Sequence, residues 1–161
     1  AKPLILDADG LFPYSDSLNE LSSRQTPLII TPHFGEFSRL INLPVEDIIS
    51  NFPIIMEDTL KVFNHTLLIK QAPICILKSN KAIVNITGNP GLATAGTGDI
   101  LSGILASFLS SGLNSFDAAT IGAFIQGKSS DKLLSSKGYR GQIASDLLGT
   151  IPYVISKYEL S

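Results

Sequence analysis

The sequence predicts an α/β protein in which a mainly parallel sheet lies between layers of helices. Short apolar runs of strand length alternate with longer segments of helical pattern, as in βαβ units. A series of helices follows, and polar or glycine-rich residues stand where several of the predicted strands end. At 161 residues, the chain is expected to form one domain with a substantial core.

The predicted strands are short and apolar on both faces, which is typical of buried parallel strands. Residues 3–6, 27–31 and 66–70 are single runs of this kind. Residues 74–77 and 82–86 flank a short polar stretch and predict a β-hairpin. Because a parallel strand begins so close to the first residue, we expect further strands to precede this sequence in a larger domain.

The predicted helices are recognised by apolar residues at helical spacing and by residues that cap helix ends. Gly112 is expected to cap the end of one helix, Ser115 to cap the start of the next, and Pro152 to break or kink the last. The expected helical segments are residues 17–24, a short helix within 42–52, 54–64, the segment that ends near 109, 115–127, 144–148 and 152–158.

Composition narrows the class of protein. A net charge of −2 gives no electrostatic reason to expect nucleic-acid binding. The lone cysteine, Cys75, excludes a disulfide within this sequence and fits a reducing compartment, while its apolar neighbours predict a buried structural thiol. The sequence has no apolar run of membrane-spanning length, and we expect a cytoplasmic protein. The histidines and the cysteine lack metal-ligand spacing.

The stretch GNPGLATAGTGDILSG, residues 88–103, is the strongest functional signal. Glycines permit close backbone approach, and the apolar helix that follows offers unpaired N–H groups and a positive dipole end. We therefore expect an anion site suited to a phosphate, with Asp99 beside it. The stretch matches neither common phosphate-loop pattern, and a plain glycine-rich connector is the alternative.

Polar side chains also follow two predicted strands. Asp7 and Asp9 end the first strand, where they suit either a polar or metal-proximal role or a simple Asx turn. Thr31, His33 and Glu36 follow the second strand, and each alone is explained by helix capping or loop structure. Two successive polar strand ends make a shared cleft the better hypothesis.

Several segments together resemble a known family. They are LDADG at residues 6–10, TPHFGEFSRL at 31–40 and the stretch 88–103, with weaker matches in GKSSD at 127–131 and ASDLL at 144–148. These motifs, in this order, resemble the ADP/ATP-dependent NAD(P)H-hydrate dehydratases. The resemblance covers nearly the whole chain and implies a ribokinase-like, three-layer α/β/α fold.

The resemblance implies a reaction that repairs nicotinamide cofactors. Hydrated (6S)-NADH or NADPH would be dehydrated to NADH or NADPH at the expense of ADP or ATP, with Mg²⁺ bridging the nucleotide phosphates. Phosphorylation would make the ring hydroxyl a good leaving group, and Asp99 would take the hydroxyl proton. The backbone N–H groups of residues 95–98 would hold the transferring phosphate.

The same motif matches imply two groups of site residues besides Asp99, which would also contact the hydrated cofactor. Those of the hydrated-cofactor site would be His33, Phe34, Gly35, Glu36, Phe37, Ser38 and Arg39. Those of the nucleotide site would be Lys70, Gln71, Ala72, Pro73, Ile74, Asn89, Pro90, Gly91, Leu92, Ala93, Thr94, Ala95, Gly96, Thr97 and Gly98.

The sequence departs from the family pattern at three positions and in its extent. Gln71 replaces a glycine, Ile74 replaces a hydroxyl residue, and Gln126 stands where histidine is common. Family members also carry further strands and helices before LDADG, including part of the hydrated-cofactor site. The resemblance thus implies that the chain works together with such a portion, and that it forms a homo-oligomer, often a tetramer in the family.

Two alternative functions remain open on the sequence alone. The first is a ribokinase-like kinase of a small vitamin precursor, which would share Asp99 and the anion site. The second is a non-catalytic nucleotide-binding fragment, supported by the altered corner at residues 70–74.

Overall fold

A five-stranded sheet forms the centre of the computed structural model, which describes residues 2–159. The strands follow one another across the sheet in chain order, and the first three run parallel while the last two pair antiparallel. Their bounds are β1 Leu4–Leu6, β2 Leu28–Ile30, β3 Thr66–Ile69, β4 Ile74–Lys78 and β5 Lys81–Asn85. The predicted strands and hairpin are therefore confirmed.

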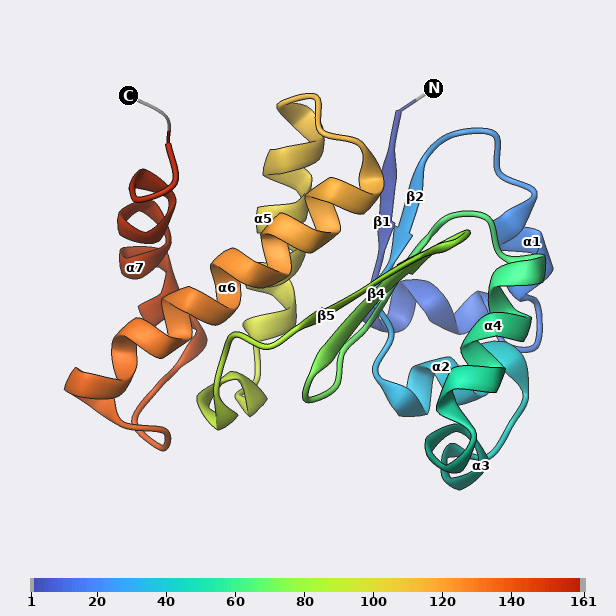
Figure 1. Cartoon of the computed structure of the whole chain (residues 1–161), viewed down its shortest axis with the longest axis horizontal. Coiled ribbons are helices and arrows are strands. Elements are labelled where there is room, and N and C mark those ends of the chain that lie inside the picture. The colour runs from blue at the N-terminus through green and yellow to red at the C-terminus, as the bar shows by residue number, and fades with distance from the viewer. Residues whose placement is uncertain (1, 160–161) are drawn as a thin grey trace.

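The described residues also contain seven α-helices and two 3-10 helices; η1 and α1 to α4 connect β1, β2 and β3, whereas η2 and α5 to α7 follow β5. Figure 1 shows α1 to α4 gathered on one side of the sheet and α5 to α7 on the other. The α-helices are α1 Leu18–Ser22, α2 Phe34–Ile41, α3 Val45–Ser50, α4 Phe52–Val62, α5 Thr97–Ser110, α6 Ser115–Lys137 and α7 Ala144–Ser156, and the 3-10 helices are η1 Ala8–Tyr14 and η2 Pro90–Ala93.

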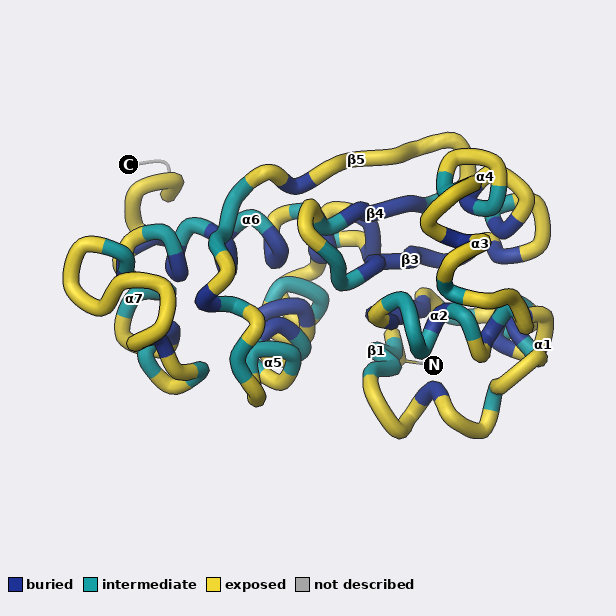
Figure 2. The backbone as a smooth tube through the Cα atoms, turned by 90° about the horizontal axis from the view of Figure 1, so that it is seen from below, coloured by how far each residue is buried: buried dark blue, intermediate teal, exposed yellow. Residues whose placement is uncertain are grey.

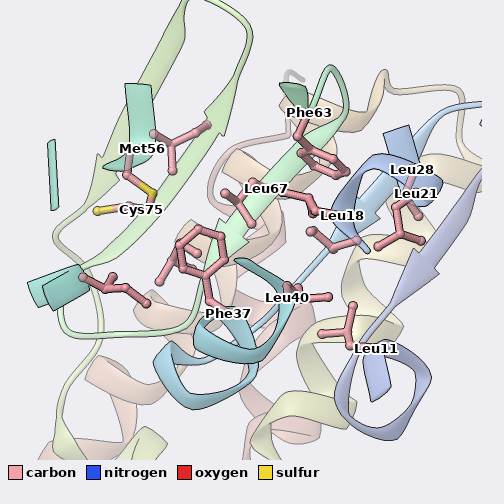
Figure 3. Close-up of a cluster of buried hydrophobic side chains, with 14 residues drawn as sticks. Leu11, Leu18, Leu21, Leu28, Phe37, Leu40, Met56, Phe63, Leu67 and Cys75 are labelled. Atoms are coloured by element: carbon pink, nitrogen blue, oxygen red, sulfur yellow. The ribbon is translucent and has the colours of Figure 1, made fainter. Parts of the chain in front are cut away.

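Side chains alternate between two cores because successive residues of a strand point to opposite faces of the sheet. Leu67 joins one core together with residues of η1 and α1 to α4, drawn in Figure 3, whereas Leu68 packs into the second core against α5 and α6. Burial on both faces explains why these strands read as continuous apolar runs. The three-layer α/β architecture is confirmed.

The hairpin strand β5 differs from its neighbours. Figure 2 shows β3 and β4 buried in the middle of the molecule and β5 exposed along its length. Four of the five β5 residues are exposed, and only Asn85 at its end is buried. None of the helices in residues 2–159 has the length and apolar character needed to cross a membrane.

Helix α6 is longer than the sequence pattern predicts. Asn114, rather than Ser115, caps its start, because its side-chain Oδ1 accepts hydrogen bonds from the N–H groups of Phe116 and Asp117, both at 3.0 Å. The Ser115 hydroxyl is instead buried and accepts from Thr66 Oγ1 at 2.8 Å. The expected end at Gly127 is also wrong, because the helix continues to Lys137.

Gly127 is the point where α6 packs closely against the segment after β5. A Cβ on Gly127 would lie 2.1 Å from Thr87 Oγ1 and 2.6 Å from the Thr87 carbonyl carbon, so a side chain at this position would overlap the segment after β5. The last helix is likewise uninterrupted, since α7 runs through Pro152 as one element. The C-terminal cap expected after α5 is present, with Gly112 in the left-handed region at φ +95°.

Candidate functional site

Polar groups from the ends of β1, β2 and β3 meet beside one lysine. The Lys70 ammonium, which follows β3, donates a hydrogen bond to the Asp7 carboxylate, which follows β1. Glu36 Oε2 lies 4.0 Å from the same Lys70 Nζ. Since all three side chains are largely buried, this ion-pair cluster is a fixed feature of the sheet edge. The polar groups that follow the first two strands therefore meet at Lys70.

The segment after β2 is ordered by a capping box at the start of α2. The Glu36 N–H donates to His33 Nδ1 at 3.1 Å, and the His33 N–H donates to Glu36 Oε2 at 2.8 Å. His33 Nε2 also lies 3.2 Å from Glu36 Oε1. These contacts turn the Glu36 carboxylate toward Lys70 and leave the His33 ring half exposed. Both residues therefore have the capping role, and their side chains also face the strand ends.

The remaining side chains of the 33–39 segment lie in different environments. Phe34 packs edge-to-face against Phe52 with 5.9 Å between ring centroids, whereas Phe37 is fully buried in the core beside α1 to α4. The Ser38 hydroxyl donates to the Leu43 carbonyl at 2.5 Å, and Arg39 is exposed. Of these four side chains, that of Phe37 is fully buried, so it could contact a ligand only if the core moved.

The N-terminus of α5 faces the ion-pair cluster. Gly96 precedes the helix with φ +88°, a left-handed conformation that favours glycine. A Cβ on Gly98 would lie 3.4 Å from Asp7 Oδ2 and 3.7 Å from Lys70 Nζ, so both groups sit directly over this helix turn. Ser102, one turn further on, donates to Asp7 Oδ2 at 3.4 Å. The positive helix end and the lysine ammonium together create a site for an anion.

Asp99 lies in the first turn of α5, next to Gly98, and its side chain is exposed. The N–H of the preceding Thr97 is already used, since it donates to the Thr94 carbonyl at 3.3 Å. This bond narrows the expected set of phosphate-binding N–H groups, residues 95–98, to three.

A cleft of about 720 Å³ opens beside this helix start. Its walls come from the corner between β3 and β4, the end of β5, the glycine-rich segment and α6. The cleft is bordered mainly by apolar side chains with a few polar groups, which is typical of a site for a small molecule. The expected nucleotide-site residues that line it are Lys70, Gln71, Ala72, Pro73, Ile74, Asn89, Pro90, Leu92, Ala93, Thr97 and Gly98.

Four expected nucleotide-site residues, Gly91, Thr94, Ala95 and Gly96, are not among the lining residues, and neither is Asp99. Gly91 is buried, because it packs directly against the Gln142 side chain. The exposed Asp99 directly follows Gly98, which does line the cleft.

Further lining residues lie outside the expected nucleotide site: Gly88 and Leu101, which belong to the 88–103 motif, and Asn85, Ile86, Thr87 and Gln126, which do not. Asn85 is held in place because its Nδ2 donates to the Ala123 carbonyl at 3.2 Å. Gln126 Nε2 donates to the Thr97 carbonyl at 2.6 Å and ties α6 to the start of α5. The sequence had marked Gln126 only as a residue that stands where the family commonly has histidine. No sequence signal indicated residues 85–87, because the end of an edge strand comes to line the cleft only through the tertiary fold.

No group of three or more histidine, cysteine, aspartate or glutamate side chains suited to a metal ion occurs in residues 2–159. Besides Asp99, the carboxylates of this site are Asp7, which pairs with Lys70, and Glu36, which lies 4.0 Å from Lys70 Nζ. A divalent cation at this site would therefore depend on phosphate oxygens for most of its ligands.

Comparison with known proteins identifies related sequences and folds. The family model described as NAD(P)H-hydrate dehydratase matches residues 1–153. The ADP-dependent (S)-NAD(P)H-hydrate dehydratase of Neisseria meningitidis is 35% identical over 150 residues, which cover 91% of this chain and 49% of that protein. The bifunctional NAD(P)H-hydrate repair enzyme of Moorella thermoacetica is 35% identical over 158 residues, or 98% of this chain and 30% of that protein.

Solved structures agree on the fold. The ADP/ATP-dependent NAD(P)H-hydrate dehydratase of Bacillus subtilis, co-crystallised with ATP and Mg²⁺ and soaked with CoA, has a TM-score of 0.84 at 25% identity, covering 98% of this chain and 57% of that one. A hydroxyethylthiazole kinase from Pyrococcus horikoshii has a TM-score of 0.68 at 18% identity over 96% of this chain and 59% of that one. The ribokinase-like fold is thus confirmed, and the chain spans about half the length of the dehydratases and less than a third of the bifunctional enzyme.

Proposed function

The chain belongs to the NAD(P)H-hydrate dehydratase family, and we propose that it provides the phosphoryl-transfer site for dehydration of (6S)-hydrated NADH or NADPH. ADP or ATP would be the phosphoryl donor, as the names of the Neisseria and Bacillus relatives indicate for those proteins. The observation that carries the proposal is the meeting of Asp7 and Lys70 over the N-terminus of α5, with Glu36 near Lys70. These groups lie beside a cleft lined by most of the expected nucleotide-site residues.

The chemistry assigns separate tasks to the two sides of Gly98. The cleft would hold the nucleotide, with its terminal phosphate at the start of α5, where the Lys70 charge and the helix N–H groups stabilise negative charge. Asp99 would remove the proton from the ring hydroxyl as that oxygen attacks the phosphorus atom. The bond from the phosphorus atom to the rest of the nucleotide breaks as the phosphate ester forms on the ring. The ester then leaves as inorganic phosphate, the neighbouring ring carbon loses a proton, and the ring regains its double bond.

Mg²⁺ fits this arrangement as a companion of the nucleotide. The described residues offer no three-ligand cluster, and Lys70 already pairs with Asp7 and Glu36, so the nucleotide phosphates would supply most ligands. When bound, the ion neutralises charge on the phosphate oxygens. The protein's own contribution is to orient the donor and to keep the Lys70 ammonium over Gly98.

The hydrated cofactor would approach from the α2 side, where the 33–39 segment begins. His33 and Glu36 present polar atoms near the strand ends, and Phe34 and Gly35 flank them. The buried side chain of Phe37 would shape this wall from behind. Ser38 and Arg39 complete the segment expected for the hydrated cofactor.

The surroundings of the site are part of the proposal. Since the chain spans about half the length of the dehydratases it matches, we propose that residues 1–161 form a single ribokinase-like unit within a larger domain, which completes the hydrated-cofactor pocket. We also propose assembly into a homo-oligomer, such as a tetramer. A cytoplasmic location is proposed as well, and the buried free thiol of Cys75 supports it. Neither nucleic acid nor a membrane is an expected partner.

The test is an incubation of the complete protein with hydrated NADH and ADP or ATP while NADH absorbance is followed. The proposal predicts a rise in absorbance that depends on both the nucleotide and Mg²⁺. The absence of any rise, together with a stable phosphorylated alcohol formed from another substrate, would replace the dehydratase by a ribokinase-like kinase. If neither NADH nor a phosphorylated alcohol is formed, only a nucleotide-binding role remains.

A further inference from the structure

The GKSSD segment, residues 127–131, has no role in the site described so far, although its last residue contacts the glycine-rich segment. Asp131 lies on α6, and both of its carboxylate oxygens are used. Oδ2 accepts the Gly88 N–H at 3.1 Å, and Oδ1 accepts from Asn89 Nδ2 at 3.2 Å. One carboxylate thereby fixes two successive residues where the segment leaves β5.

Asn89 connects this carboxylate to the rest of the segment. Its Oδ1 accepts the Gly91 N–H at 2.9 Å, which caps η2, and it also accepts from Gln142 Nε2 at 3.2 Å. Since Asn89 lines the cleft, its orientation sets the position of that wall. All the hydrogen-bonding groups on its side chain are directed by protein partners.

Gln142 closes the network from the loop before α7. It is 4% exposed, its Oε1 accepts from Ser130 at 2.7 Å, and its backbone carbonyl accepts from Thr94 Oγ1 at 3.3 Å. A Cβ on Gly91 would lie 2.6 Å from Gln142 Cδ, so the segment packs directly on this amide. A buried polar network with its partners satisfied specifies one arrangement of the groups it joins.

Asp131, Ser130 and Gln142 do not line the cleft; they lie behind the segment that does. That segment is irregular apart from the single 3-10 turn η2, and Gly88 has φ +100°. It therefore depends on side-chain partners for a fixed shape. Because a negative charge strengthens the hydrogen bonds that it accepts, Asp131 supplies the strongest of these restraints.

We propose that Asp131 and Gln142 are positioning residues that hold the 88–94 segment in its nucleotide-binding shape and so set the affinity for the nucleotide. The identity of the ligand rests on the proposed function. The two residues act through Asn89 and Gly91 and touch neither the nucleotide nor the reacting atoms. Their loss is expected to weaken nucleotide binding while leaving the chemical step unchanged.

The experiment compares ADP and ATP binding to the complete protein in the wild type, Asp131→Asn and a matched control, Asp117→Asn. Asp117 is on the same helix and also pairs with an asparagine, accepting from Asn114 Nδ2 at 2.6 Å, but it lies exposed in the first turn. We expect the nucleotide Kd to rise about tenfold for Asp131→Asn and to stay unchanged for Asp117→Asn. In turnover, the KM for nucleotide should rise while kcat and the KM for hydrated NADH stay within about twofold.

Equal nucleotide affinity of Asp131→Asn and the wild type would overturn the inference, as would a loss of kcat at unchanged KM. If Asp131→Asn fails to fold, Gln142→Met must show the same affinity loss, and wild-type affinity in that variant overturns it as well. Because binding is measured without hydrated NADH, a wild type that binds nucleotide but forms no NADH contradicts only the proposed reaction. A wild type that binds neither ADP nor ATP overturns both.

Discussion

Replacing Gly127 by alanine tests the packing that joins α6 to the cleft. The new Cβ would lie 2.1 Å from Thr87 Oγ1, 2.6 Å from the Thr87 carbonyl carbon and 2.7 Å from the Thr87 carbonyl oxygen. Two of these atoms belong to the backbone, so the clash cannot be relieved by rotating one side chain. Inserting a methyl group into a packed site costs roughly 1–3 kcal/mol, and the backbone contact places Gly127→Ala at the upper end.

Helix propensity opposes this cost, since alanine is better than glycine inside a helix by about 1 kcal/mol. We therefore expect a net loss of about 2 kcal/mol in the free energy of unfolding of Gly127→Ala. The matched control is Gly149→Ala in α7, where no described heavy atom lies within 4 Å of the new Cβ. It should gain about 0.5–1 kcal/mol, because only the propensity changes.

The assay is urea denaturation of the complete protein. The unfolding free energies of both variants are compared with that of the wild type, provided that all three show the same dependence of this free energy on urea concentration. The two variants should differ by about 3 kcal/mol in unfolding free energy, which is the overpacking cost alone, because both gain the helix propensity of alanine. Since Thr87 also lines the cleft, Gly127→Ala should weaken nucleotide binding and Gly149→Ala should not. If Gly127→Ala is as stable as Gly149→Ala, the close contact between α6 and the segment after β5 does not exist.

Two further changes test the site and the core. Lys70→Met removes the positive charge that pairs with Asp7 and lies near Glu36, so nucleotide affinity measured by calorimetry should fall about tenfold or more. Lys61→Met, which breaks an exposed pair on α4, should leave that affinity unchanged. Equal affinities of the two variants would remove Lys70 from the phosphate site. Burial lowers the pKa of His65 below its ordinary 6.5, so the folded state resists protonation and the free energy of unfolding should decrease as pH falls below about 6.5. His65→Gln should flatten that decrease. An unchanged pH dependence of the unfolding free energy in this variant would contradict the lowered pKa of His65 as its cause.

The strands and the start of α5 were predictable because their signals are local. Residues 66–70 form an apolar run of strand length, and the structure ends β3 at Ile69 with Lys70 at the sheet edge. The start of α5 was likewise readable from its glycines, since close backbone approach and a left-handed turn at Gly96 both require them.

What the sequence could not predict depends on contacts between distant segments. Gly127 reads as the end of a helix, but it is needed in the middle of α6 because Thr87 passes too close for a side chain. The pairing of Asp7 with Lys70 joins residues far apart along the chain and follows only from the parallel order of β1, β2 and β3. Asp131 was part of a weak motif without a role until the fold placed it beside Gly88.

Asp99→Asn in the complete protein, assayed for both turnover and nucleotide binding, tests the central claim most directly. Asp99 is exposed in the first turn of α5 and does not line the cleft, so its carboxylate should serve the hydroxyl proton and leave nucleotide binding intact. We predict that NADH formation from hydrated NADH falls at least about a hundredfold, with nucleotide Kd within about twofold of the wild type. Unchanged turnover would show that Asp99 is not the base and would contradict the account.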